Sequence, residues 1–477
     1  MVLRFAFAAT VLCGAVLCRA DMVPATAGAP AEILKILATQ RLPPEAVSFV
    51  IMDAATGRIV VSHGAEVPRS PASTLKVVTT FASLDTLGPA FTWQTRALIH
   101  GAIENGVLSG DLVLQGGGDP YMTLERWWGF ARLLRSRGLK AIRGDIIVDN
   151  TGFSVPNVDP GAFDGRPNRA YNVLPDALMV NFQSIDFTLV PNANLRKVEI
   201  VADPAPVNLT VDNRIRYADG RCSGAARRVD FDVASAAWDR VVFTGMLSRR
   251  CASRSFTRVL LKPPQYAYGT FVSFWRSLGG EFDGRLRVEA APPGAEALLA
   301  YDSLTLGEVI RLTNKYSSNL MARHLLLTMG RERFGAPATI EKGTAAIGEW
   351  SRGRNLALED VDMDNGSGLS RSTRISVLTM ANVLDAAYRS RYAPEFIASL
   401  PLAGIDGTLR TRMLGAPAGA VRLKTGHLDG VSGIAGYVTA ANGRCYVLVC
   451  LVNHPRADDG AAEPVHAALV QWVLDQH

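Results

Sequence analysis

Residues 71–76 read Pro-Ala-Ser-Thr-Leu-Lys and lead directly into an apolar run, Val77 to Leu87. The apolar positions of this run have helical spacing, and the run ends at Gly88-Pro89, so the sequence predicts a buried helix with Ser73 in its first turn. A serine and a lysine three positions apart share one face of such a turn. The amine of Lys76 is then close enough to take the hydroxyl proton of Ser73, which predicts a serine nucleophile with a lysine base.

Lys76 can act as this base only if its surroundings lower its pKa. An exposed lysine has a pKa of about 10.4 and is a poor base at neutral pH. Burial, a helix N-terminus and a second cation each lower that pKa, and the second cation has to come from elsewhere in the chain. Taken alone, the Ser-x-x-Lys pattern equally fits a helix-capping serine followed by a surface lysine.

The composition indicates a protein with a large core. The chain has 477 residues, of which 48% are hydrophobic, enough for two or three domains. Its formal charge of +6 comes mostly from arginines that are scattered along the chain. No long basic run or basic patch with interleaved aromatic residues occurs, so a nucleic-acid partner is not indicated. An exported protein of this charge would be attracted to anionic polymers of the cell envelope.

Residues 1–20 have the pattern of a secretory signal peptide. Arg4 precedes an apolar run, Phe5 to Leu17, and the segment Cys18-Arg19-Ala20 resembles a cleavage site ahead of Asp21. The apolar run is shorter than a membrane span. The sequence therefore predicts export and a mature, soluble protein in the periplasm.

Four cysteines follow the predicted signal peptide. Cys222 and Cys251 flank a strand-rich segment and are candidates for a disulfide in an oxidising compartment. Cys445 and Cys450 lie in one apolar strand, where their odd separation puts them on opposite faces as separate thiols. No cysteine spacing resembles a metal site, and we expect no metal.

The hydrophobic pattern divides the mature chain into three segments. Residues 21–92 and 262–477 carry helical patterns and apolar strands that together predict one domain. Residues 93–261 are richer in alternating strands and read as an insertion with one or two lobes. A final amphipathic helix has Val465, Leu469 and Val473 on one face, which favours packing on the preceding hairpin over contact with a membrane.

Three short motifs occur in a fixed order along the chain: Ser73-x-x-Lys76, Ser317-x-Asn319 and Lys424-Thr425-Gly426. Each motif is weak alone, but the ordered trio behind a signal peptide resembles the signature of penicillin-recognising serine enzymes, the penicillin-binding proteins and serine β-lactamases. Lys424 supplies the second cation that a lysine base requires.

The residue types suit acyl transfer. Ser73 would attack a carbonyl carbon, Lys76 would accept its proton, and Ser317 would relay that proton from the lysine to the leaving amine. Asn319 would hold Lys76 and the substrate amide. The alternative for Ser317 and Asn319, a helix cap, is compatible with these roles.

The third motif predicts the substrate-binding side of the site. Lys424 would pair with a substrate carboxylate beside the Thr425 hydroxyl. Gly426, on an edge strand, would let a peptide lie close. The backbone N–H groups of Ser73 and His427 would form an oxyanion hole, with the His427 imidazole at the rim.

The strand-rich block between Ser73 and Ser317 is far longer than in a simple β-lactamase. The chain resembles the D-alanyl-D-alanine carboxypeptidase/endopeptidase family of penicillin-binding protein 4, whose peptidase domain is split by a large insertion. Further matching segments are Gly118-Asp119-Pro120, Gly144-Asp145 with Asp149, Gly366-Ser367-Gly368-Leu369-Ser370-Arg371 and Asp406-Gly407-Thr408-Leu409. The chain departs from that family at Asn365, where Asp is usual, and at Ser318, where Asp or Asn is common.

The resemblance implies an α+β fold, a serine β-lactamase/DD-peptidase-like domain with an antiparallel sheet flanked by helices. It implies hydrolysis of peptidoglycan stem peptides ending in D-Ala-D-Ala, or of D-Ala-diaminopimelate cross-links, through an acyl-enzyme on Ser73. β-Lactams would acylate the same serine, and no cofactor is implied. The rival interpretations are a β-lactamase or esterase of the same superfamily, and a non-catalytic envelope scaffold or β-lactam sensor. Exopeptidase or endopeptidase preference, the third residue of the stem peptide, homodimer formation and the role of the insertion are left open.

Overall fold

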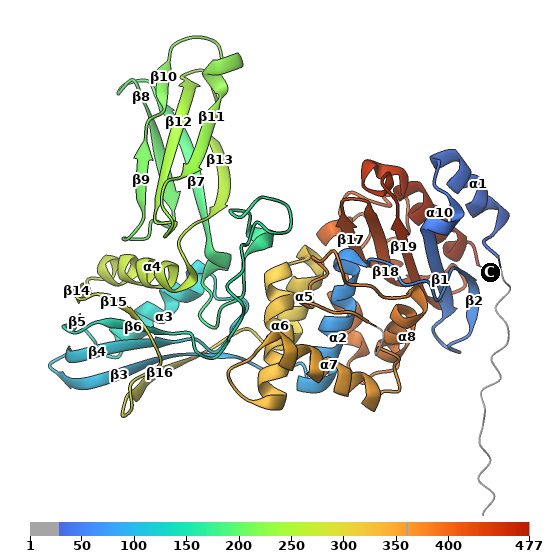
Figure 1. Ribbon diagram of the computed structural model, residues 1–477, viewed down its shortest axis with the longest axis horizontal. Helices are drawn as coiled ribbons and strands as arrows, with labels where there is room; N and C mark the ends of the chain where they lie inside the picture. The colour runs from blue at the N-terminus through green and yellow to red at the C-terminus, as the bar shows by residue number, and fades with distance from the viewer. Residues whose placement is uncertain (1–27, 359–360, 477) are drawn as a thin grey trace, which may run out of the picture.

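The computed structural model describes residues 28–358 and 361–476, so the predicted signal peptide lies outside the described residues. None of the helices in these ranges is long and apolar enough to cross a membrane. The chain forms a main domain, residues 28–93 and 303–476, and an inserted domain, residues 94–302 (Figure 1). The two domains lie side by side, and the upper part of the inserted domain projects away from the rest (Figure 1).

The main domain is built on an antiparallel five-stranded sheet. Its order is β17 (Val421–Leu428), β18 (Val431–Thr439), β19 (Cys445–Asn453), β1 (Val47–Asp53) and β2 (Ile59–His63). Strands β17 and β2, which are far apart in the sequence, form the two edges of this sheet. The third motif, at residues 424–426, therefore lies on an edge strand, as predicted.

Helices cover both faces of this sheet. One face carries α2 (Lys76–Leu87), α5 (Leu306–Tyr316), α6 (Asn319–Phe334), α7 (Ile340–Gly353), α8 (Val377–Tyr388) and α9 (Ala393–Ser399), and the other carries α1 (Ala31–Gln40) and α10 (Glu463–Leu474). Strand β19 shows why both faces are covered. Val447 and Val449 face the first helix layer, while Leu448 and Cys450 face the second, so the strand is apolar at every position before Asn453.

Two expectations about this layer are confirmed. The apolar face of α10 packs on the sheet through Val465, Leu469 and Val473, all fully buried. Cys450 is buried in the α1/α10 layer, whereas Cys445 packs against the opposite one. The α+β fold with a helix-flanked antiparallel sheet is therefore confirmed.

The lower part of the inserted domain is a seven-stranded mixed sheet with two helices. It contains β3 (Gln94–Glu104), β4 (Val107–Gln115), β5 (Ala141–Ile142), β6 (Ile146–Asp149), β14 (Glu281–Phe282), β15 (Leu286–Val288), β16 (Glu296–Asp302), α3 (Leu124–Ser136) and α4 (Pro263–Ser277). We expected the chain to return to the main domain at residue 262. Instead β16 pairs with β3, and α4 packs on α3, so the insertion extends to Asp302.

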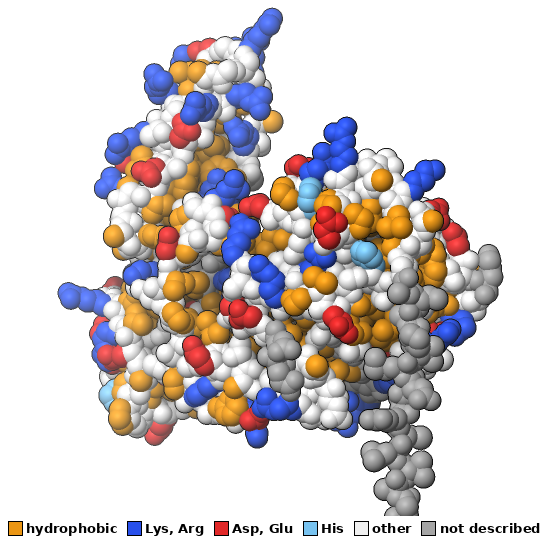
Figure 2. Space-filling model, turned by 45° about the vertical axis from the view of Figure 1, so that its right-hand side comes forward, with side chains coloured by type: hydrophobic (Ala, Val, Ile, Leu, Met, Phe, Trp, Pro, Cys, Tyr) orange, Lys and Arg blue, Asp and Glu red, His pale blue; other side chains and the backbone are white. Residues whose placement is uncertain are grey.

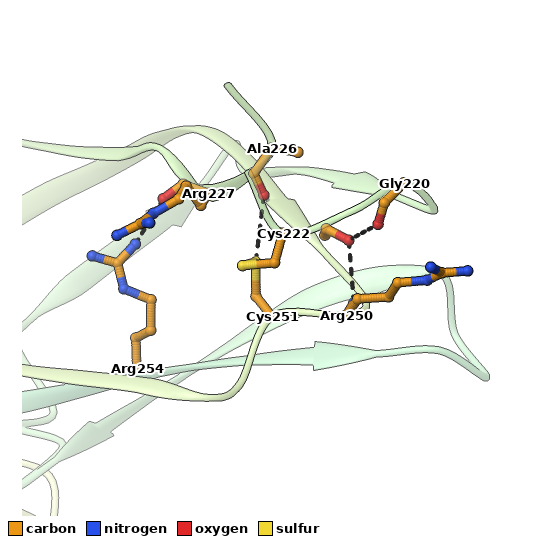
Figure 3. The surroundings of a disulfide bond; sticks show 8 residues. Gly220, Cys222, Ala226, Arg227, Arg250, Cys251 and Arg254 are labelled. Carbon is orange, nitrogen blue, oxygen red and sulfur yellow. Dashed lines mark hydrogen bonds between the residues drawn. A yellow bond between two sulfur atoms is a disulfide. The ribbon is translucent and has the colours of Figure 1, made fainter. Parts of the chain in front are cut away.

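The upper part is a lobe of two small sheets. One contains β7 (Ser184–Asn192), β8 (Lys197–Asp203) and β13 (Arg254–Val259), and the other β9 (Thr210–Asn213), β10 (Arg216–Ala218), β11 (Val229–Val233) and β12 (Arg240–Ser248). Phenylalanines from both sheets, among them Phe187 and Phe243, pack together between the two sheets. Cys222 and Cys251, the candidate pair, form a disulfide in this lobe (Figure 3).

Candidate active site

Ser73 lies in a tight turn wedged between two backbone segments. The turn, Ala72–Leu75, is a 3₁₀ helix that runs directly into α2, so the serine precedes the α-helix by three residues. A β-carbon on Gly426 would lie 2.6 Å from the carbonyl oxygen of Pro71, and one on Gly368 would lie 1.8 Å from that of Ala72. Ala72 itself has a φ of 46°, in the left-handed region. Strand β17 and the loop at residue 368 thus hold the serine turn from two sides.

Lys76 is fully buried behind the serine and its amine is fully coordinated. Its Nζ lies 2.9 Å from Ser73 Oγ, 2.7 Å from Asn319 Oδ1 and 2.6 Å from the carbonyl oxygen of Ser367. The Asn319 and Ser367 oxygens only accept hydrogen bonds. When the amine is neutral, its two N–H groups satisfy these two acceptors and its lone pair is left facing the hydroxyl of Ser73.

The surroundings favour that neutral form. Burial lowers the pKa of Lys76 well below its ordinary value, and the positive charges of Lys424 and Arg323 lower it further. Lys424 is therefore the second cation that the sequence required. Arg323, one turn after Asn319 on α6, is a contributor that the motifs did not indicate.

The second motif forms the junction between α5 and α6. Ser317 ends α5 in the left-handed region, with a φ of 57°, and the Ser318 side chain caps α6 by accepting from the N–H of Met321. Ser318 is thus a working helix cap. Asn319 then begins α6 with its amide turned toward Lys76.

The third motif brings a buried cation to the other side of the serine turn. Lys424 Nζ donates to Ser317 Oγ at 2.8 Å and to the carbonyl oxygen of Thr425 at 2.7 Å. Burial lowers the pKa of Lys424 to about 7. The Thr425 hydroxyl donates to Thr408 Oγ1 at 2.7 Å. The segment at residues 406–409 thus adds the Thr408 hydroxyl to those of Ser317 and Thr425.

Two details differ from our sequence-based expectations, and a third agrees with them. The Ser317 hydroxyl accepts from Lys424, and among the described residues no hydrogen bond joins it to Lys76. The missing side chain of Gly426 makes room for the Ser73 turn rather than for a bound peptide. His427, next to Gly426 on β17, has an exposed side chain, in agreement with the rim position that we expected.

Two backbone carbonyls complete the site and were missed. The Ser367 carbonyl is held by a loop in which Asn365 Oδ1 accepts from the N–H and the hydroxyl of Ser367. The Nδ2 of Asn365 also donates to the Leu369 carbonyl, which an aspartate could not do. The second carbonyl belongs to Tyr171 of the inserted domain and accepts from Asn319 Nδ2 at 3.1 Å.

The arrangement has the parts of an acyl-transfer centre. It combines a serine hydroxyl, a buried amine aimed at it, a second buried cation and hydroxyls on the far side. No group of three or more His, Cys, Asp or Glu side chains that could hold a metal ion occurs within residues 28–358 and 361–476.

Comparisons with known proteins match nearly the whole described chain. The model of the D-Ala-D-Ala carboxypeptidase 3 (S13) family matches residues 29–476. The chain is 27% identical over 438 residues to the D-alanyl-D-alanine carboxypeptidase DacB of Haemophilus influenzae, with 91% of each chain covered.

Solved structures agree with this match. The crystal structure of penicillin binding protein 4 (dacB) from Haemophilus influenzae matches with a TM-score of 0.79 at 26% identity, covering 94% of this chain and 100% of that one. The same protein complexed with a novel β-lactam matches with a TM-score of 0.76 at 25% identity, with the same coverage. The predicted resemblance is therefore confirmed for the main and the inserted domain together. The chain belongs to the D-Ala-D-Ala carboxypeptidase 3 (S13) family.

Proposed function

We propose that this protein is a serine-type D-Ala-D-Ala carboxypeptidase and/or DD-endopeptidase that acts on peptidoglycan stem peptides through an acyl-enzyme on Ser73. The observation that carries the proposal is the arrangement around Lys76, whose amine lies 2.9 Å from Ser73 Oγ with its other two contacts on pure acceptors. An S13 relative named as a D-alanyl-D-alanine carboxypeptidase supports the substrate class.

In the acylation step, Ser73 Oγ attacks the carbonyl carbon of the penultimate D-Ala and its proton passes to neutral Lys76. The carbonyl oxygen becomes an oxyanion, which the backbone N–H groups of Ser73 and His427 would stabilise. Such a donor pair typically contributes about 10²–10³ in rate for each donor. Lys424 and Thr425 bind the terminal carboxylate of the substrate during this step.

Collapse of the tetrahedral intermediate breaks the peptide bond and expels the amine of the C-terminal residue. That amine needs a proton, and the Ser317 hydroxyl relays one to it. The hydrogen bond between Lys424 and Ser317 supports this route, because the ammonium can resupply the hydroxyl. The proton that Lys76 took from Ser73 replaces the one that Lys424 gave up, so Lys76 is neutral again. Water then attacks the ester on Ser73 and passes its proton to Lys76, which returns it to the Ser73 oxygen as the ester breaks and the serine is freed.

The same serine would be acylated by β-lactams, because opening of the lactam ring also forms an ester on Ser73 and the leaving nitrogen stays attached. The homologous penicillin binding protein 4 bound to a β-lactam supports this expectation. The Cys222–Cys251 disulfide supports residence in an oxidising compartment, in agreement with the predicted signal peptide at residues 1–20 and a periplasmic location.

The direct test is release of D-Ala from the diacetyl-Lys-D-Ala-D-Ala peptide by the wild-type protein and by Ser73→Ala. We expect stoichiometric release by the wild type and none by the variant. Rapid hydrolysis of a penicillin with no release of D-Ala would instead indicate a β-lactamase. Absence of both activities would favour the scaffold interpretation.

A further inference from the structure

A cleft with a volume of about 470 Å³ lies between the upper lobe of the inserted domain and the segment at residues 163–171. Its lining contains an unusual concentration of guanidinium groups. Arg166 and Arg169 come from the segment, and Arg254 and Arg258 come from strand β13. We call this the arginine cleft.

The positive charge of the cleft is largely uncompensated. Asp230 is the one carboxylate in its lining, and Arg228, outside the cleft, lies 3.5 Å from it. None of the four cleft arginines forms an ion pair within the described part of the chain, and Arg166 interacts only at longer range with Asp164 of the same segment. Arg258 is half-buried, and burial and the neighbouring Arg169 lower its pKa. Like charges so close together favour the binding of an anion.

The cleft arginines are held in place by the sheet. Arg254, Phe256 and Arg258 alternate along β13, so their side chains share one face. The Arg254 guanidinium donates to the carbonyl oxygen of Arg227 at 2.7 Å, beside the disulfide (Figure 3). The Arg258 guanidinium lies over the Phe256 ring, with 4.8 Å between its Cζ and the ring centroid. Rings and guanidinium planes of this kind form a surface that is both basic and apolar.

The segment that closes the cleft also reaches the active site. At one end, Asn168 exchanges two hydrogen bonds with the backbone of Val259, at the end of β13. At the other end, the Tyr171 carbonyl accepts from Asn319. Arg169 is two residues from Tyr171, so their Cα atoms are at most about 7 Å apart. An occupant of the cleft therefore lies within reach of a chain that is bound at Ser73.

The cleft belongs to a lobe that is basic as a whole. Figure 2 shows Lys and Arg side chains spread over the projecting lobe, with fewer acidic groups among them. A stem peptide that ends in D-Ala carries a terminal carboxylate. A peptidoglycan chain with several stems thus presents carboxylates beyond the one that is bound at Lys424, whereas a short tripeptide does not.

We propose that the arginine cleft is a second substrate-binding site, which holds the carboxylates of a neighbouring stem peptide while another stem of the same peptidoglycan chain occupies the active site. The proposal rests on the function proposed above and explains why the insertion meets Asn319. Paired guanidinium–carboxylate hydrogen bonds would supply the affinity, so binding weakens as salt is added.

The test compares D-Ala release from two substrates by Arg254→Gln/Arg258→Gln. One is diacetyl-Lys-D-Ala-D-Ala and the other is soluble, uncross-linked peptidoglycan chains with pentapeptide stems. We expect KM for the chains to rise about tenfold with kcat unchanged, because two charge-assisted contacts are lost. Both constants for the short peptide should stay at the wild-type values, which also shows that the variant is folded. The salt dependence of KM for the chains should become shallower.

The matched control is Arg216→Gln/Arg250→Gln, which removes the same charge from exposed positions of the same lobe outside the cleft. An equal rise of KM in this control, or no rise in the cleft variant, overturns the proposal. Loss of binding to phosphatidylglycerol vesicles by the cleft variant, with KM for the chains unchanged, would assign the cleft to phosphates instead.

A binding assay separates this proposal from the proposed function. Ser73→Ala should co-sediment with insoluble peptidoglycan, and Ser73→Ala/Arg254→Gln/Arg258→Gln should do so several-fold less, whether or not the wild type is a peptidase. Equal co-sedimentation of these two variants would refute the proposal that the arginine cleft binds peptidoglycan. Failure of the wild type to release D-Ala from the short peptide would refute the proposed function alone.

Discussion

Replacement of Gly426 by alanine puts a methyl group between strand β17 and the serine turn. The added carbon would lie 2.6 Å from the Pro71 carbonyl oxygen and 3.1 Å from the Thr74 nitrogen, both backbone atoms. Because β-carbons essentially never approach other atoms closer than 3.0 Å, the two segments must separate by at least 0.4 Å. A misplacement of 1 Å in an active site costs about 10²-fold, so we expect acylation by benzylpenicillin to slow on the order of tenfold.

The assay is the second-order rate of penicilloyl-enzyme formation, followed by intact-mass spectrometry. Over-packing costs about 1–3 kcal/mol, so the free energy of unfolding should fall only modestly and the variant should remain folded. Gly415→Ala is the matched control, because its added carbon meets no atom within 4 Å. A wild-type acylation rate in Gly426→Ala would refute the view that this glycine positions Ser73.

Three further outcomes follow from the site. Lys76→Met removes the base but leaves no buried charge unpaired, so acylation should slow by about 10²–10⁴-fold while the melting temperature is kept or raised. The pKa of Lys424 is about 7 in the empty site, so its cation is present below pH 7 and lost above it; KM for diacetyl-Lys-D-Ala-D-Ala should therefore rise as pH increases from 7 to 9. Lys315→Met breaks the ion pair between Asp406 and Lys315, which is only 5% exposed. The free energy of unfolding from urea titration should therefore fall by about 1–3 kcal/mol, and adding Asp406→Asn to Lys315→Met should restore part of that loss.

The helices and strands of the main domain were predictable because their apolar positions recur with clear periods. The serine turn, the α5–α6 junction and strand β17 each carried a motif, and their order pointed to one site before any contact was known. Lys424 is an example of physical reasoning that worked, since the demand for a second cation near Lys76 came from the chemistry of a lysine base.

What was missed has a common cause, because backbone groups and strand partners leave no signature in side chains. Ser367 and Tyr171 contact the catalytic groups through their backbone carbonyls. Every residue has such a carbonyl, so the identity of these two residues gave no signal. The insertion was ended 41 positions early, at 261 instead of Asp302, because helical and alternating patterns do not reveal which sheet an element joins. Which segment packs against Gly426, where other residues have a β-carbon, likewise depends on a tertiary contact.

The most direct measurement of the central claim is the position of the covalent adduct. Trypsin cleaves after Arg69 and Lys76, so the serine lies in the peptide at residues 70–76, which also contains the hydroxyls of Ser70 and Thr74. After incubation of the mature protein with benzylpenicillin, fragmentation of this peptide should place one penicilloyl group on Ser73, and none in Ser73→Ala. An adduct on another residue, or one that persists in Ser73→Ala, would contradict the assignment of Ser73 as the nucleophile.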